Sequence, residues 1–289
     1  ELVCPEFVAG IGTGAGAVSE GELRYIKNIY IKTDRGEILC MLPCRALYKI
    51  ATIRSGSPPR KDAIAAATGT YRVDLPIYFS DDALLRPEDT ILDTRRYSSL
   101  ELHVTLGSIS DLITTPGTAT VDSVTLDCEV IRTKGLLPEE SAPIGHVFYA
   151  TRPPIDANSA TEVLLDKGVA DLWIKRLFTH ECSSGTAGVS WSGANADDVK
   201  DIVSVEDQSG FVVQSRIHEM IQNQNKDDYS LETALAGIEV FDFVSDGSIQ
   251  SALWVGDKSK LSLTWTNKAG VAANDLVSVA YDAIRTLKE

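Results

Sequence analysis

The chain has 289 residues, of which 44% are hydrophobic and 24% are charged, and its formal net charge is −14. This length allows two domains of ordinary size, each with its own core. The acidic balance argues against a surface that binds nucleic acid or anionic lipid through bulk electrostatics. No apolar run is long enough to predict a membrane-spanning helix, and the first residues lack the basic and apolar regions of a signal peptide.

A glycine-rich run at 10–16 is the first feature of the chain. Gly12, Gly14 and Ala17 have the spacing of a dinucleotide fingerprint. The context does not fit that site, because a strand pattern follows the run where a helix would be required. A similar run at 183–189 also precedes a strand pattern, so both runs are predicted to be loops that connect strands.

The segment 25–42 predicts a β-hairpin, and a second version of it returns at 198–213. In both, apolar and charged residues alternate along the first strand, and an Asp-and-Gly turn follows. The apolar positions that we align are Ile26, Ile29 and Ile31 in the first copy with Val199, Ile202 and Val205 in the second. This similarity predicts an internal repeat.

The neighbours of this hairpin recur in the same order along the chain. The matched blocks are 75–81 with 240–246, 100–105 with 261–266, and 126–133 with 279–286. The repeat therefore predicts two tandem β domains, residues 1–157 and 158–289. It also predicts that three pairs of residues superpose, namely Ile26 on Val199, Leu102 on Leu263, and Ile131 on Ile284.

The stretches between these blocks carry weaker signals. The spacing of apolar residues favours helices over 45–52 and 216–222, one after each hairpin. Residues 84–94 are expected to form a long excursion between strands, because a proline interrupts them. The proline-rich stretch 134–160 is typical of an inter-domain connection, and a strand is expected near 172–178.

Cysteine and histidine provide no recognisable metal motif. The five cysteines form no CxxC pair, which favours a reducing compartment. The four histidines, His103, His146, His180 and His218, lack the His-x-His pair of metal-binding jelly rolls of the cupin type. We therefore expect surface or core histidines. Whether a metal is bound stays open, with a structural calcium ion at a loop or subunit contact as one possibility.

No arrangement for acid–base or nucleophilic catalysis is evident. Neighbouring residues on a strand face opposite ways, so two acidic residues that are adjacent in sequence do not bring their carboxyl groups together. We expect such adjacent pairs to be solvated turn residues. These pairs are Asp81-Asp82, Glu139-Glu140, Asp197-Asp198 and Asp227-Asp228. The segment 188–192 misses the GxSxG elbow of serine hydrolases at its last position. We therefore expect no enzymatic activity, no catalytic residue and no cofactor.

The predicted layout of two β domains in tandem resembles a known viral family. The features that carry this resemblance are the repeated hairpins, the strands LPIYFSD and VFDFVSD, and the matched ends IRT. The sequence is similar to the double jelly-roll major capsid proteins of tailless icosahedral viruses with an internal membrane, the tectivirus and corticovirus group. The resemblance covers nearly the whole chain. It implies an all-β fold of two tandem eight-stranded antiparallel jelly rolls with short helical inserts.

The resemblance also implies function and partners. Such a protein would form a homotrimer, a pseudo-hexagonal capsomer of the virion shell, assembled in the host cytoplasm. Its partners would be neighbouring capsomers, minor capsid or vertex proteins and an internal viral membrane, with no direct contact to nucleic acid. Loops 78–96 and 242–258 are expected to contribute to contacts within or between trimers.

The alternative is a two-domain jelly-roll protein that binds or processes carbohydrate. Such a protein would need a cleft at the domain junction, lined by aromatic and acidic side chains. Its candidate residues are Trp173, Trp191 and Asp171.

Overall fold

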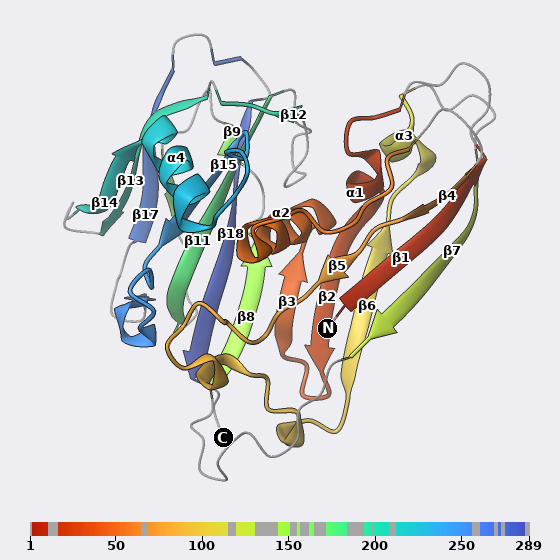
Figure 1. Ribbon diagram of the computed structural model, residues 1–289, viewed down its shortest axis with the longest axis horizontal. Coiled ribbons are helices and arrows are strands. Elements are labelled where there is room, and N and C mark those ends of the chain that lie inside the picture. Colours follow the sequence, from red (N-terminus) through yellow and green to blue (C-terminus); the bar gives the residue numbers. More distant parts are fainter. Residues whose placement is uncertain are drawn as a thin grey trace. The chain divides into compact units, whose positions relative to one another are not determined.

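The structure is a computed structural model (Figure 1). It describes residues 2–10, 17–64, 69–114, 120–130, 144–150, 155–156, 162–164, 172–183, 194–197, 199–207, 212–255, 261–268, 271–272 and 275–286. The chain forms two compact units, one of residues 1–78 and 97–136 and one of residues 79–96 and 137–289. Every strand pairing in the described ranges is antiparallel.

The first unit contains two sets of strands. In one, β1 (Leu2–Gly10) lies between β7 (Thr120–Glu129) and the pair β4 (Gly69–Arg72) and β5 (Leu75–Pro76). In the other, β2 (Ile26–Thr33) lies between β3 (Ile38–Leu42) and β6 (Leu100–Leu106). Three helices complete this unit, namely α1 (Gly21–Tyr25), α2 (Cys44–Ser55) and α3 (Ile109–Leu112).

Helix α2 shows how local sequence determines an element of this unit. Pro43 lies at its N-cap, where a missing N–H has no cost, and Leu47 and Ile50 share the buried face of the helix. The helix ends at Gly56, whose φ of +71° is the left-handed conformation that glycine adopts without strain. α2 packs on β2 and β5, so the apolar face of the helix covers this part of the core.

The second unit is built on the same plan. In one sheet, β11 (Leu172–Ser183) pairs with β18 (Leu276–Thr286) on one side. β11 also pairs with three shorter strands, β12 (Ala194–Asn195), β15 (Ile238–Asp242) and β16 (Leu253–Trp254). β18 also pairs with β8 (Ile144–Ala150) and β9 (Ile155–Asp156). The other sheet has the order β10 (Glu162–Leu164), β17 (Leu261–Asn267), β13 (Lys200–Asp207) and β14 (Val212–Ile217).

The predicted repeat is present in the pairing of the strands. The hairpin β2–β3 is followed by α2 and paired with β6, and the hairpin β13–β14 is followed by α4 (His218–Asp228) and paired with β17. Likewise β1 pairs with β5 and β7, as β11 pairs with β15 and β18. In their described parts, the four sequence blocks thus lie on equivalent strands, and the helices expected after the hairpins are confirmed.

The alignment of the first strands needs a correction of one residue. Leu102 lies opposite Ile31 and Leu263 opposite Val205, so Leu102 and Leu263 are equivalent as predicted. From the same pairing, Ile29 corresponds to Val203 and not to Ile202. Val203 is fully buried whereas the side chain of Ile202 is 43% exposed.

The alignment differs by one residue because the ladders β2–β6 and β13–β17 both contain irregularities, which a strict alternation of apolar residues does not predict. The register shifts between Ile26 and Asn28 in one copy and between Lys200 and Val203 in the other. Ile26 therefore corresponds to Lys200 by its pairing, not to Val199. The predicted superposition of Ile131 on Ile284 lies outside the described residues, because Ile131 is not among them.

The compact units also differ from the predicted boundary between residues 157 and 158. Residues 144–150, expected within a connection, form β8, which pairs with β18 from Ile144 to Ala150. Residues 79–96, from the first half of the chain, also belong to the second unit.

The segment 79–96 contains two short 3₁₀ turns, Pro87–Thr90 and Thr94–Arg96. Its Leu84 packs with Val244 and Ala252 in a small apolar cluster, and the N–H of Leu85 donates to the carbonyl of Gly247 over 2.8 Å. This segment and the loop after β15 therefore contact each other within one chain.

The main core of the second unit lies between its two sheets. It is formed by fully buried side chains from both, among them Leu177 and Tyr281 from one sheet and Val203 and Leu263 from the other. A buried aliphatic side chain stabilises the fold by about 1.5–3 kcal/mol relative to an exposed one. Within the described parts of the chain, no helix has the length and apolar character needed to cross a membrane.

Candidate functional site

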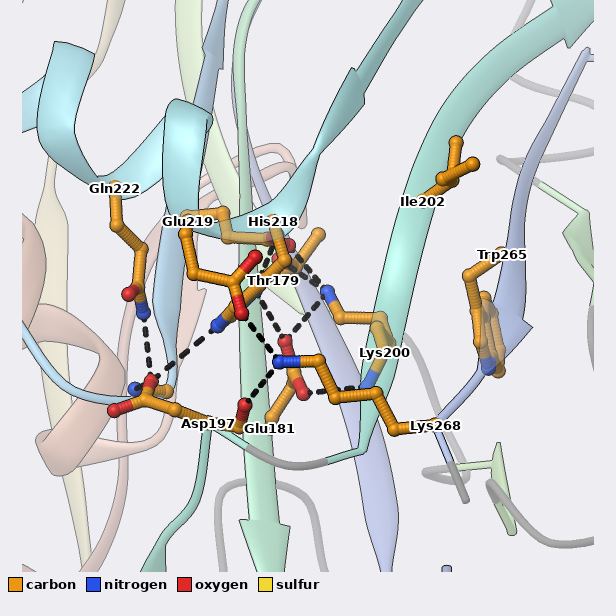
Figure 2. A network of polar contacts seen from close by, with 12 residues as sticks. Thr179, Glu181, Asp197, Lys200, Ile202, His218, Glu219, Gln222, Trp265 and Lys268 are labelled. Atoms are coloured by element: carbon orange, nitrogen blue, oxygen red, sulfur yellow. Dashed lines mark hydrogen bonds and ion pairs between the residues drawn. The ribbon is translucent and has the colours of Figure 1, made fainter.

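Two networks of buried charged side chains lie in the second unit, and strand β11 contributes to both. We call the first the Glu181–His218 network; its members are Thr179, Glu181, Lys200, His218 and Glu239. Thr179 and Glu181 are two residues apart on β11 and so lie on one face of the strand. Lys200 begins β13 and His218 begins α4 (Figure 2). Glu239 belongs to β15. All five residues are fully buried.

Glu239 is the most heavily hydrogen-bonded member of this network. Its Oε1 accepts from Nδ1 of His218 over 2.6 Å, and its Oε2 accepts from Oγ1 of Thr179 over 2.6 Å and from Nζ of Lys200. Glu181 accepts from the backbone N–H of Lys200 over 3.0 Å. Since Glu181 and Glu239 lie in one sheet and Lys200 in the other, the network connects the two sheets.

The charges of the Glu181–His218 network balance. Burial alone favours a neutral His218, but hydrogen bonds to Glu181 and Glu239 outweigh it and raise the pKa of His218 to about 10. Burial likewise opposes ionisation of Glu239, whereas Lys200 and His218 hold the pKa of its carboxyl at about 2. The two carboxylates also raise the pKa of Lys200 against the effect of burial. Two carboxylates thus face two cations.

Among the described residues, Glu181, His218 and Glu239 form a group of possible metal ligands, with one ligand atom of each within 4.8 Å of the others. Nζ of Lys200 lies against Glu239 and 3.3 Å from Oε1 of Glu181. The lysine therefore occupies the position at which these carboxylates would hold a cation. No metal-ligand motif in the sequence marks this group, because its residues come from three separate elements.

The second network, the Asp81–Arg176 network, comprises Asp81, Lys175, Arg176, Asp242 and Asp282. Nζ of Lys175 lies 2.6 Å from Oδ2 of Asp81 and 3.0 Å from Oδ1 of Asp282. Arg176 donates from Nη1 to Asp81 over 2.5 Å and to Asp282 over 3.2 Å, and from Nε to Asp242 over 2.9 Å. Burial of Arg176 opposes its positive charge, but these carboxylates outweigh that effect and raise the pKa of the guanidinium.

An irregularity in β11 explains how two successive side chains enter one network. In the ladder with β18, Ile174 pairs with Ala283 and Arg176 with Asp282, so Lys175 is an extra residue on the β11 side. Such an insertion interrupts the alternation of side chains and re-aims one of them. Lys175 and Arg176 consequently reach the same two carboxylates.

Asp81 is a turn residue as expected, since its Oδ1 accepts from the N–H of Ala83 over 3.3 Å, but the expectation that it is solvated is wrong. Asp81 is 1% exposed, because the segment 79–96 carries it into the second unit. Asp197 is exposed, yet its Oδ1 lies 3.4 Å from Nε2 of His218 and accepts from Gln222 over 2.7 Å. Asp227 and Asp228 are exposed near the end of α4. Glu139, Glu140 and Asp198 lie outside the described residues.

The histidines occupy different environments. His103 stacks on Tyr30 with ring centroids 4.3 Å apart, and its Nε2 lies 3.0 Å from Glu101. His180 is buried and interacts with Asn195 over 3.0 Å. His146 belongs to β8. Of the four, only His218 lies in a buried network of charged groups among the residues that the structure describes.

Of the three residues proposed for carbohydrate binding, Trp173 is the one that lies in the described part of the chain. Trp173 stacks on Trp254 at a centroid distance of 5.6 Å and packs against the cluster of Leu84, Val244 and Ala252. Trp191 and Asp171 lie outside the described residues. Trp173 thus has a packing role in the second unit.

One sequence signal could have revealed both networks. The strand LWIKRLFTHECS carries Lys175, Arg176, His180 and Glu181, all buried, among apolar residues. A strand that is covered on both faces usually has a continuous run of apolar residues. Charged residues within such a strand therefore indicate that oppositely charged side chains from elsewhere in the chain pair with them. The sequence does not say which carboxylates those partners are.

No protein-family model matches the sequence, and a search of the curated proteins finds no match. Solved structures do match over almost the whole chain. The major capsid protein of Sulfolobus turreted icosahedral virus is 10% identical with a TM-score of 0.66, covering 99% of this chain and 88% of that one.

Two further structures agree with this result. The major capsid protein P2 of bacteriophage PM2 is 11% identical with a TM-score of 0.58, and the alignment covers 99% of this chain and 87% of that one. The PBCV-1 virus capsid is 13% identical with a TM-score of 0.58, at 98% and 86% coverage. The chain therefore has the double jelly-roll fold that these viral capsid proteins share.

Proposed function

We propose that this chain is a major capsid protein, a structural component of the shell of an icosahedral virus. The observation that carries this proposal is the match over 98–99% of the chain to three viral capsid proteins. The agreement includes both jelly rolls, so it concerns the whole architecture and not one common domain. The role is structural, without a catalysed reaction.

The assembly that we propose is a homotrimer. Three copies with two similar barrels each provide six similar corners, which suits packing against neighbouring capsomers in a hexagonal array. The internal repeat of strand pairings supports this, because it makes the two barrels of one chain alike. Minor capsid or vertex proteins and an internal viral membrane are the further partners. The protein would be found in the virion after assembly in the host cytoplasm.

The net charge of −14 supports a shell that does not bind the genome directly. A protein with this net charge gains little binding free energy from contacts with phosphate backbones at physiological salt.

Size-exclusion chromatography coupled to light scattering tests the proposal. We expect a mass near three chains that persists on dilution, since obligate interfaces usually bury more than about 2,000 Å². Electron microscopy of the same fraction should show particles with threefold symmetry. A strict monomer at micromolar concentration contradicts the proposal.

A further inference from the structure

We infer that Lys175 and Asp81 form an intramolecular isopeptide bond, with Asp282 as the group that takes the lysine proton. The inference rests on the Asp81–Arg176 network and is independent of the capsid assignment. Nζ of Lys175 lies 2.6 Å from Asp81 and 3.0 Å from Asp282. The amine therefore touches both the carboxyl that it attacks and a second carboxyl.

Burial is the first condition for this reaction. The side chains of Lys175 and Asp282 are 0% exposed and that of Asp81 is 2% exposed. Amide formation releases water, so it is disfavoured in bulk water. Groups held in contact react with effective molarities of about 10⁵–10⁸ M, which can offset this disadvantage in a site closed to solvent.

Charge is the second condition. Among the residues that the structure describes, the ion pairs of this network join three carboxyl groups, Asp81, Asp242 and Asp282, to two cations, Lys175 and Arg176. A proton on one of the carboxyl groups makes the network neutral, and a buried neutral network costs less than a charged one. A protonated Asp81 is the form that an amine can attack with loss of water.

The step balances in atoms and charge. One proton of the Lys175 ammonium passes to the Asp282 carboxylate, and the neutral Nζ then attacks Cγ of the protonated Asp81. A C–N bond forms and the bond from Cγ to the hydroxyl oxygen breaks. The hydroxyl group leaves with a second proton from Nζ as water. The products are a secondary amide, one water molecule and a protonated Asp282, with no oxidant or reductant involved.

Arg176 can stabilise the intermediate of this step. Its Nη1 lies 2.5 Å from Oδ2 of Asp81, where negative charge develops during the attack. The other oxygen, Oδ1, accepts from the N–H of Ala83 over 3.3 Å, which helps to hold the carboxyl group in place. Arg176 itself does not compete as a nucleophile, because a guanidinium is not deprotonated in proteins.

The bond would join the segment 79–96 to strand β11. This segment comes from the first half of the sequence and is held in the second unit by the apolar cluster around Leu84. A covalent link at Asp81 would prevent its release even where the non-covalent contacts open.

Lys200, a second buried lysine among the described residues, provides a matched comparison. Lys200 also touches two carboxylates, Glu181 and Glu239, but His218 supplies a second cation there. Lys200 and His218 match these two carboxyl groups, and the third carboxyl group near His218, that of Asp197, belongs to a side chain that is 46% exposed and can be solvated. We expect no bond at Lys200.

Mass spectrometry of the intact, denatured protein decides the inference. We expect the wild-type chain to be lighter than its sequence by one water molecule, and a digest to contain a linked pair of peptides that carry Lys175 and Asp81. Full mass in the wild-type protein, or a link at other residues, overturns the inference. This measurement needs no variant and so does not depend on whether a variant folds.

Variants then test the roles of the three groups. Lys175→Arg retains the positive charge without a nucleophilic amine, and Asp282→Asn removes the proton acceptor, so both should have full mass. Asp81→Asn should lose ammonia in place of water, because the attacked group is then an amide. Lys200→Arg is the control and should lose one water molecule as the wild type does. Loss of water from Lys175→Arg contradicts the assignment.

Discussion

Nδ1 of His218 lies 2.6 Å from Oε1 of Glu239, and neither side chain is exposed to solvent. The pKa of His218 is about 10 in the folded protein, against 6.5 for an ordinary histidine. A raised pKa contributes stability that is fully present below about pH 6.5 and is lost as the pH rises towards 10. Each unit of the difference corresponds to about 1.4 kcal/mol.

We therefore predict that His218→Gln lowers the free energy of unfolding most at about pH 6 and least at about pH 10. Urea denaturation of wild type and variant at several pH values measures this. His103→Gln is the control, since that ring lies at the surface beside Glu101. A difference between wild type and His218→Gln that does not change with pH contradicts the charged state of His218.

Glu20 gives the opposite pH dependence in the first unit. Burial opposes its ionisation, but Arg45 and Lys49 outweigh that effect and lower the pKa of Glu20 from 4.5 to about 2. Oε2 lies 2.6 Å from Nε of Arg45 and Oε1 lies 2.8 Å from Nζ of Lys49. A lowered pKa contributes stability that is present above about pH 4.5 and is lost as the pH falls towards 2.

Glu20→Gln should consequently cost on the order of 3 kcal/mol at neutral pH and much less near pH 2. Denaturant unfolding at the two pH values is the measurement, with Glu232→Gln as an exposed control. Equal losses at both pH values would falsify the role of this ion pair.

The corrected register of β13 predicts a contrast between two neighbouring residues. Val203 is fully buried opposite Trp265, whereas Ile202 is 43% exposed. We expect Val203→Ala to lower the free energy of unfolding by about 2 kcal/mol, because it removes buried methyl groups and leaves a cavity. Ile202→Ala should cost less than about 1 kcal/mol. Thermal unfolding of the two variants compares them, and the reverse order would restore the register expected from the sequence.

Gly237 is a position where a side chain cannot be accommodated. Its φ is +69°, and an added Cβ would lie 2.6 Å from the backbone oxygen of Glu181. Gly237→Ala should therefore destabilise the second unit by more than about 1 kcal/mol and disturb the neighbouring Glu181–His218 network.

Gly36 is the matched control for this substitution. It has a similar φ of +81° but nothing within 4 Å of an added Cβ. Gly36→Ala tests the backbone strain alone, which is about 1 kcal/mol. Calorimetric unfolding should show the larger loss for Gly237→Ala, and equal losses would show that the close contact does not matter.

The repeat was visible in the sequence because strand pairing requires alternating apolar residues and turn residues at both ends. The hairpins at β2–β3 and β13–β14, the helices that follow them and the equivalence of Leu102 with Leu263 could all be predicted. These features depend on local patterns, and a local pattern survives when loops change in length.

The buried networks were decided only by the tertiary structure. Asp81 and Lys175 are 94 residues apart, and Lys200 meets Glu239 from the opposite sheet. Which carboxylate neutralises a buried cation depends on how distant segments are packed, and on an irregularity such as the one at Lys175 that alternation does not reveal. The sequence by itself determined the order and kind of the strands, because their pairing faces are encoded residue by residue. The partners of the buried charges follow from long-range packing, which no local pattern contains.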